Sequence, residues 1–86
     1  MGIDKVCVRQ ECLQPADVWT RPMGSEVKEV LESAGFSASQ AARSIGLTSK
    51  GGDRTVRRWI SEESPIPYAA WALLCDFAGL GIIWKR

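Results

Sequence analysis

Three arginines at helical spacing are the side chains of this sequence best suited to bind an anionic partner. Arg54, Arg57 and Arg58 lie close together in the chain, and at about 100° per residue they share one side of a helix. Val56 and Trp59 fall on the other side, where they can pack in a core. Arginine carries its donors in a planar fork that fits a phosphate group or the edge of a guanine. No acid falls among the outward positions, which favours a nucleic-acid-binding helix over the alternative of an ordinary solvated face.

The positive charge of the chain is concentrated around these arginines. The 86 residues, enough for one small domain, have a formal net charge of only +1. Within residues 43–58, however, five basic residues stand against one acid, Asp53. A local basic patch on a nearly neutral protein is typical of a domain that binds phosphates with one face. We therefore expect the function to reside in the region of residues 37–60.

Two helices separated by a glycine-marked turn should position the arginines. Ser37 and Gln40 have the spacing of a capping box at the start of the first helix, and Gly46 is expected to end it. Asp53 follows two glycines and is predicted to be the N-cap of the second helix. The turn from 46 to 53 is longer than the roughly three or four residues of a typical motif. The pattern as a whole predicts a helix-turn-helix, the layout of a DNA reader.

Another helix should precede this motif. It is expected to run from Gly24 or Ser25 to Ala34, with Ser25 as its cap. Glu26 and Glu29 lie near the positive end of its dipole. Valine, leucine and alanine at helical spacing should face the core, whereas the exposed side is acidic. This helix should therefore point away from DNA.

The C-terminal region, residues 67–86, is predicted to be a helix from 68 to 78, with Pro67 at its first position, and a short tail. The helix is apolar nearly all round. One stripe, which contains Trp71, can close the core. The second stripe, which contains Leu73, and the Ile-Ile-Trp sequence of the tail need a partner subunit to cover them. We therefore expect this region to form the interface of a homodimer.

Residues 1–22 form an N-terminal arm with few structural signals. The alternation over residues 5–9 predicts a short strand. Residues 13–19 are expected to hold one helical turn and, at their end, a tryptophan that packs against the helical core. A contact of Arg9 or Arg21 with a DNA groove is the functional alternative for this arm.

The cysteines and the absence of histidine argue against an enzyme. Cys7, Cys12 and Cys75 are odd in number, and the chain has no histidine. A zinc site would need carboxylates to complete its ligands, and no Cys-His or Ser-His arrangement is possible. We expect reduced thiols, with Cys75 buried, and neither a metal nor another cofactor. No apolar run is long enough to cross a membrane and the N-terminus lacks a signal peptide, so we expect a cytoplasmic protein.

Three stretches resemble the lambda-repressor-like (Cro/C1-type) helix-turn-helix regulators. They are Ser-Gln-Ala-Ala-Arg-Ser-Ile-Gly-Leu, Arg-Thr-Val-Arg-Arg-Trp-Ile and Pro-Ile-Pro-Tyr-Ala-Ala-Trp-Ala-Leu-Leu, within a similarity that covers about residues 24–80. The small plasmid- and phage-borne repressors are the most similar subgroup, in particular the KorC-type repressors of conjugative plasmids. The resemblance implies an all-α fold of four to five helices, with short, partly extended arms at both ends.

The same resemblance implies that the chain binds operator DNA as a dimer, with the second motif helix in the major groove. By motif position, the expected DNA-binding residues are Ser37, Ser39, Gln40, Arg43, Ser49, Lys50, Asp53, Arg54, Thr55, Arg57 and Arg58. The predicted function is a homodimeric, sequence-specific transcriptional repressor that acts on a palindromic operator in double-stranded DNA, with no evident small-molecule effector. The alternative is a protein-interaction module, such as an antitoxin or an adaptor, that uses the same fold to hold another protein.

Overall fold

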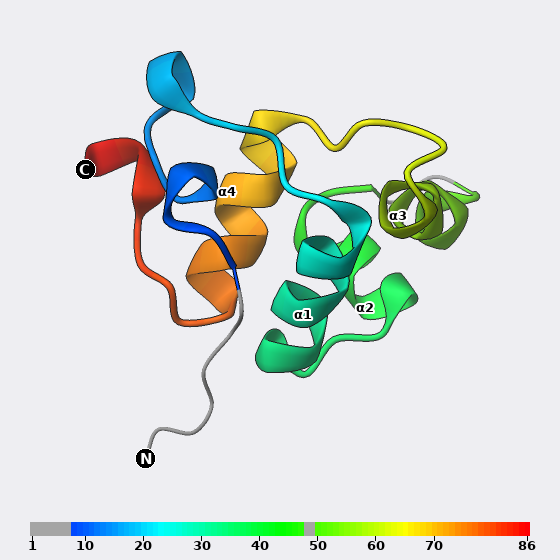
Figure 1. Cartoon of the computed structure of the whole chain (residues 1–86). Helices are drawn as coiled ribbons and strands as arrows, with labels where there is room; N and C mark the ends of the chain where they lie inside the picture. The colour runs from blue at the N-terminus through cyan, green and yellow to red at the C-terminus, as the bar shows by residue number, and fades with distance from the viewer. Residues whose placement is uncertain (1–7, 48–49) are drawn as a thin grey trace.

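The computed structural model describes residues 8–47 and 50–86, which form a small helical bundle (Figure 1). Within these residues there are four α-helices, three short 3-10 helices and no β-strand. The α-helices are α1 (Gly24–Ala34), α2 (Ala38–Ser44), α3 (Gly52–Ser61) and α4 (Tyr68–Phe77), and the 3-10 helices are η1 (Gln10–Cys12), η2 (Ala16–Val18) and η3 (Ile83–Lys85). The prediction of an all-α helix-turn-helix bundle is confirmed.

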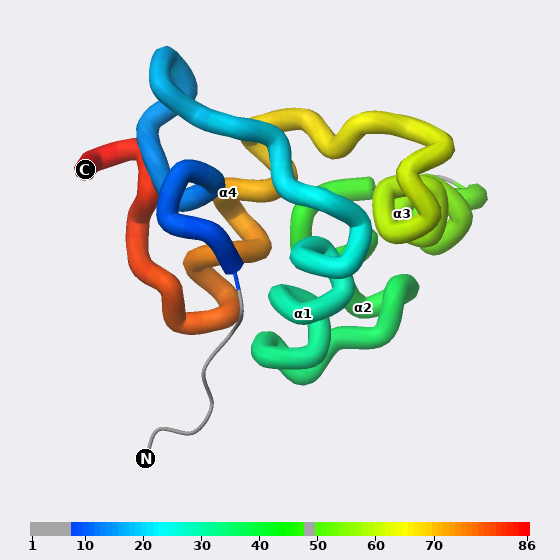
Figure 2. Tube along the Cα trace, in the orientation of Figure 1, coloured from blue at the N-terminus to red at the C-terminus, as the bar shows by residue number. Residues whose placement is uncertain are grey.

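The packing of the helices does not simply follow their order in the chain. α2 packs on α3, and α1 contacts both α3 and α4. The connection from α3 to α4 crosses the molecule, so that α3 lies at one edge of the view and the C-terminal segment at the opposite edge (Figure 2). Within residues 8–47 and 50–86, this arrangement leaves one side of α3 without a neighbouring helix.

The N-terminal arm is folded onto α4 through backbone carbonyl groups. The Cys12 carbonyl oxygen accepts hydrogen bonds from the indole nitrogens of Trp71 (2.6 Å) and Trp19 (3.1 Å). The Tyr68 hydroxyl donates to the Gln14 carbonyl oxygen (2.9 Å). The predicted helical turn is present as η2, and the packing of Trp19 against the core is confirmed.

The predicted strand over residues 5–9 is absent in its described part. Val8 and Arg9 belong to no strand, and residues 5–7 lie outside the described residues. The backbone N–H of Arg9 donates to the Glu26 carboxylate of α1 (3.0 Å) rather than to another strand. A strand would instead need a second strand to satisfy its backbone groups.

Glu26 is buried, contrary to the expectation that it lies on an exposed acidic side of α1. The residue is only 5% exposed. Its carboxylate accepts three hydrogen bonds from Arg9, from the backbone N–H (3.0 Å), Nε (2.9 Å) and Nη2 (2.9 Å). It also accepts the N–H of Met23 (2.7 Å), which precedes α1, so Ser25 is not the cap. Burial opposes ionisation of Glu26, but these hydrogen bonds outweigh it and lower the pKa to about 2. Arg9 therefore has a structural role at the start of α1, and its contact with a DNA groove stays a prediction.

The start of α1 is fixed against the end of α3. A Cβ atom on Gly24 would overlap the Ile60 carbonyl group, so only glycine allows the two helices to come this close. Glu62 ends α3 in the left-handed conformation (φ 68°) and accepts the Gly24 N–H with its carboxylate (2.7 Å). The orientation of α3 is thus set by its contact with α1 as well as by its contact with α2.

The C-terminal tail contributes to the core of its own chain. Ile83 is fully buried, whereas Ile82 and Trp84 are 42% and 43% exposed. The expectation that the whole Ile-Ile-Trp sequence needs a partner subunit is therefore wrong for Ile83. The 3-10 turn of η3 directs this one side chain inward, toward α4.

The two described cysteines are buried thiols. Burial raises the pKa of Cys12 to about 11 and that of Cys75 to about 12, so both are protonated near neutral pH. The predicted burial of Cys75 is confirmed, and Cys7 lies outside the described residues. No group of potential metal ligands occurs in residues 8–47 and 50–86. In the same part of the chain, no helix has both the length and the apolar character needed to cross a membrane.

Candidate nucleic-acid interface

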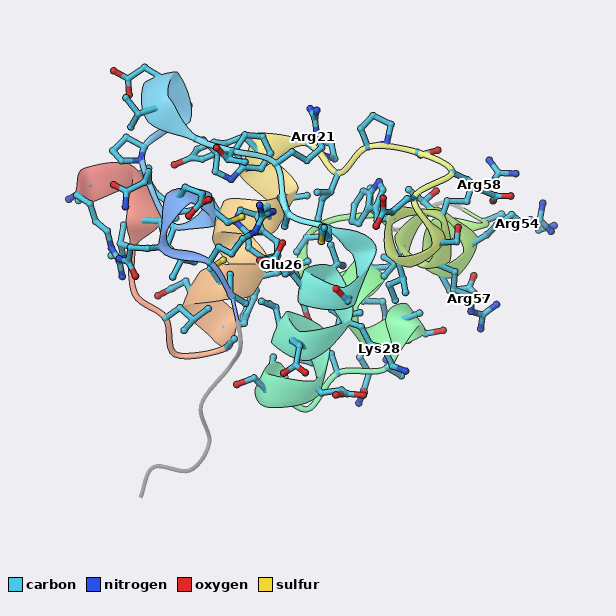
Figure 3. The ribbon with its side chains drawn as sticks, in the orientation of Figure 1. Arg21, Glu26, Lys28, Arg54, Arg57 and Arg58 are labelled. Carbon is cyan, nitrogen blue, oxygen red and sulfur yellow. The ribbon has the colours of Figure 1, made fainter. Side chains whose placement is uncertain are left out.

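α3 has one buried and one exposed face, as the sequence predicts. Val56 is fully buried and Trp59 is 5% exposed, so both anchor the helix in the core. Arg54, Arg57 and Arg58 are all exposed and project away from the body of the molecule (Figure 3). Since no helix of the described residues covers this face, the three guanidinium groups are available to a partner as large as DNA.

The N-cap of α3 lies two residues before the predicted one. The helix begins at Gly52, and Gly51 is its N-cap in the left-handed conformation (φ 91°), so Asp53 is not the cap. A Cβ atom on Gly52 would lie 2.5 Å from the Leu47 carbonyl oxygen and 3.1 Å from Ala42 Cβ. The two glycines therefore have separate roles, one in the turn and the other in bringing α3 close to α2.

Two acids pair with the arginines of α3, which corrects the expectation of an outward face without acids. Asp53 Oδ2 lies 3.2 Å from Arg57 Nη1, and Glu63 Oε1 lies 3.9 Å from Arg58 Nε. The structure shows no ion pair for Arg54 among the described residues. The sequence does contain a signal for the first pair, because Asp53 and Arg57 have the i, i+4 spacing at which helical side chains meet.

The start of α2 is held by the predicted capping box. Ser37 Oγ accepts the Gln40 N–H (3.2 Å), and Gln40 Oε1 accepts the Ser37 N–H (2.8 Å). Both residues are exposed. Their oxygens accept the N–H groups at the helix end, which leaves the Ser37 hydroxyl hydrogen and the amide nitrogen of Gln40 able to donate to a phosphate.

A hollow of about 230 Å³ lies between α2 and the start of α3. It is lined by Ser39, Ala42, Arg43, Leu47, Gly51, Gly52 and Asp53. Three expected DNA-binding residues, Ser39, Arg43 and Asp53, are therefore brought together from two helices. The hollow joins the exposed side of α2 to that of α3, so the two helices present one continuous surface.

The remaining expected residues have different surroundings. Thr55 is half-buried, and its hydroxyl donates to the Gly51 carbonyl oxygen (3.3 Å), which stabilises the first turn of α3. Lys50 is exposed in the turn before α3. Ser49 lies outside the described residues.

Arg21, the other arginine considered for a groove contact, lies apart from the α3 arginines (Figure 3). Its Nε donates to the Ile66 carbonyl oxygen (3.2 Å), and its guanidinium carbon lies 5.4 Å from the centre of the Trp19 ring. The side chain thus connects the N-terminal arm to the segment before α4. These contacts give Arg21 a structural role that the sequence pattern does not reveal.

Comparison with curated proteins found two similar chains from Escherichia coli, each called transcriptional repressor protein KorC. One is 62% identical over 80 residues, which cover 93% of each chain. The other is 62% identical over 79 residues, which cover 92% of each chain. A comparison with protein-family profiles found no match, and no solved structure is significantly similar.

Proposed function

Because this chain belongs to the KorC family of transcriptional repressors, we propose that it represses transcription as a homodimer on a palindromic operator. The observation that supports this proposal most directly is the exposed arginine face of α3, backed by the buried face of Val56 and Trp59. A helix with this division can enter the major groove with its arginines while the rest of the domain holds it rigidly. Such a protein is a regulator rather than an enzyme, and we expect it to act in the cytoplasm, where its operator is.

The surface that we propose to contact DNA extends from α2 across the hollow to α3. Its members are Ser37, Ser39, Gln40, Arg43, Ser49, Lys50, Asp53, Arg54, Thr55, Arg57 and Arg58. Arg54 lies in the first turn of α3, the end that usually enters the groove, and Arg57 follows about one turn later. We expect these two to read bases, whereas Arg58, further round the helix, can reach a base or a phosphate.

The proposed homodimer uses the exposed apolar face of α4. Leu73 and Phe77 are 41% and 50% exposed, and Trp84 from the tail lines a hollow together with Leu73. An apolar hollow of about 350 Å³ lies here, lined by Tyr68, Ala69, Ala72, Leu73 and Trp84. A second copy that packs its own α4 and tail into this hollow would bury these side chains on both subunits. Two-fold symmetry of the protein then implies a palindromic operator.

The arginine face is tested by selecting duplexes from a random DNA pool and measuring the affinity of Arg54→Ala, Arg57→Ala and Arg58→Ala at several salt concentrations. Loss of an arginine that reads a guanine should cost ~1–3 kcal/mol and relax the preference at one base pair. Loss of a phosphate contact should weaken selected and scrambled DNA alike and lower the salt slope by about one. Lys28→Ala is the control, because this exposed lysine lies on α1, apart from the α3 arginines (Figure 3).

The same measurements distinguish the repressor from a protein-interaction module. A repressor requires at least one arginine variant with a position-specific loss. If the wild type selects no sequence, or if all three variants weaken both duplexes equally, the arginines provide only electrostatic attraction. The interaction-module alternative would then describe the chain better, and the apolar hollow on α4 would be its first candidate site.

A further inference from the structure

The ion pair between Asp53 and Arg57 differs from the other acid–arginine pair of α3. Asp53 Oδ2 lies 3.2 Å from Arg57 Nη1, within one helix and one turn apart. The side chain of Asp53 is 37% exposed and that of Arg57 is 67% exposed. The carboxylate of Asp53 therefore lies close to the helix surface, beside the hollow between α2 and α3, while the guanidinium of Arg57 extends outward.

The contact occupies only part of the Arg57 guanidinium. Asp53 approaches Nη1, and the described residues provide no hydrogen-bond partner for Nε or Nη2. These two nitrogens lie along one edge of the planar group and match the spacing of guanine O6 and N7. An arginine restrained in this way presents a pair of donors and loses less of the rotational freedom of its long side chain on binding.

The negative charge of Asp53 makes its direct contact with DNA unfavourable. It is the second residue of α3 and shares the hollow with Arg43 on a surface that should face phosphates. A carboxylate near phosphates is repelled unless a cation compensates it, and Arg57 is that cation. As the surface becomes desolvated against DNA, the ion pair gains strength because the dielectric screening falls.

We propose that Asp53 is a positioning residue, which acts on specificity through Arg57 by holding its guanidinium for one guanine, and which reads no base itself. This inference depends on the proposed function, since it requires sequence-specific DNA binding by α3. It assigns Asp53 a role different from the direct DNA contact that the family resemblance implies. Arg54, which has no ion pair among the described residues, should lack such a positioning partner.

The test measures discrimination, defined as the ratio of affinities for a duplex selected by the wild type and for variants of it with one base pair changed. Asp53→Asn should lower discrimination roughly three- to tenfold at one base pair, the range between an exposed and a desolvated ion pair. That base pair should be the one at which Arg57→Ala also loses discrimination. The affinity of Asp53→Asn for scrambled duplex should not fall, because one negative charge has been removed from a DNA-binding surface.

Three variants make this result specific. Asp53→Glu keeps a carboxylate four residues before Arg57, so it should retain most of the discrimination. In the double variant of Asp53→Asn and Arg57→Ala, discrimination at that base pair should be the same as in Arg57→Ala alone. Glu63→Gln is the matched control, since it removes one acid beside Arg58 from a longer pair (3.9 Å) whose acid is more exposed than Asp53. It should leave discrimination at the Arg57 base pair unchanged.

Each other outcome contradicts the inference in a recognisable way. If Asp53→Asn changes a base pair that Arg57→Ala leaves unaffected, Asp53 reads a base directly. Equal losses for selected and scrambled DNA would show a merely structural role, and unchanged discrimination would show no role at all. If the wild type itself prefers no sequence, the proposed function fails together with the inference, whereas in the three preceding cases the proposed function stands.

Discussion

The buried carboxylate of Glu26 should make the stability of this domain sensitive to acid. In the folded protein its pKa is about 2, compared with an ordinary value of 4.5. A group with a depressed folded pKa stabilises the protein above its unfolded pKa, and this contribution is lost as the pH falls through the folded value. Stability should therefore be retained above about pH 5 and decrease toward pH 2. The difference between the two pKa values corresponds to ~3 kcal/mol, at about 1.4 kcal/mol per pH unit.

Glu26→Gln isolates this contribution from that of the other carboxylates. The amide keeps one acceptor but loses the charge, and its NH₂ group faces the donors of Arg9 and Met23. At pH 7 the free energy of unfolding should fall by ~3 kcal/mol, a large part of the roughly 5–15 kcal/mol of a typical domain. Between pH 5 and pH 2 the variant should lose less stability than the wild type.

Urea unfolding followed by tryptophan fluorescence, repeated at pH values from 7 to 2, measures both effects. Glu32→Gln is the control, because Glu32 is an exposed acid on the same helix, and its variant should unfold like the wild type. Should Glu26→Gln match the wild type at pH 7 and follow the same pH dependence, the ion pair with Arg9 would contribute nothing to stability. The assignment of a structural role to Arg9 would then be refuted.

Three further changes test other parts of the structure. Trp59→Ala should cost roughly 3–5 kcal/mol in urea unfolding, because this side chain is 5% exposed beneath the arginine face; wild-type stability with loss of DNA binding alone would mean that the faces of α3 are assigned wrongly. Leu73→Glu should convert a dimer into a monomer in sedimentation experiments, since it places a charge in the apolar hollow on α4. Val18→Glu, at an exposed position outside the hollow, is the control and should leave the dimer intact. A wild type that remains monomeric at high concentration would refute the dimer. Gly52→Ala should lower stability by ~1–3 kcal/mol, because its Cβ atom would lie 2.5 Å from the Leu47 carbonyl oxygen, and an unchanged unfolding midpoint would contradict this close approach of α3 to α2.

The parts of the fold that depend on local sequence were predictable. The capping box of Ser37 and Gln40 needs only a spacing of three residues, and the buried side of α3 follows from the spacing of Val56 and Trp59. The C-terminal end of α1 at Gly35, where the backbone is left-handed (φ 75°), is also a local signal. These features are determined by neighbours in the chain, which is why periodicity and capping rules reveal them.

Features that depend on distant parts of the chain were not predictable. Glu26 is buried because Arg9, 17 residues earlier, folds back onto it, and no pattern within α1 indicates this partner. Ile83 enters the core only because η3 turns against α4. In the candidate site, the sequence identified the arginines, but the hollow that brings Arg43 near Asp53 depends on how α2 and α3 pack.

The separation of the two faces of α3 has a consequence for how such a repressor can evolve. Val56 and Trp59 anchor the buried face of the helix in the core, while the opposite face exposes Arg54, Arg57 and Arg58. Exposed positions tolerate substitution with little change in stability. If these outward side chains read the operator as proposed, new combinations of them can accumulate on an unchanged scaffold, and duplicated copies of the gene could come to recognise different operators without compensating mutations in the core.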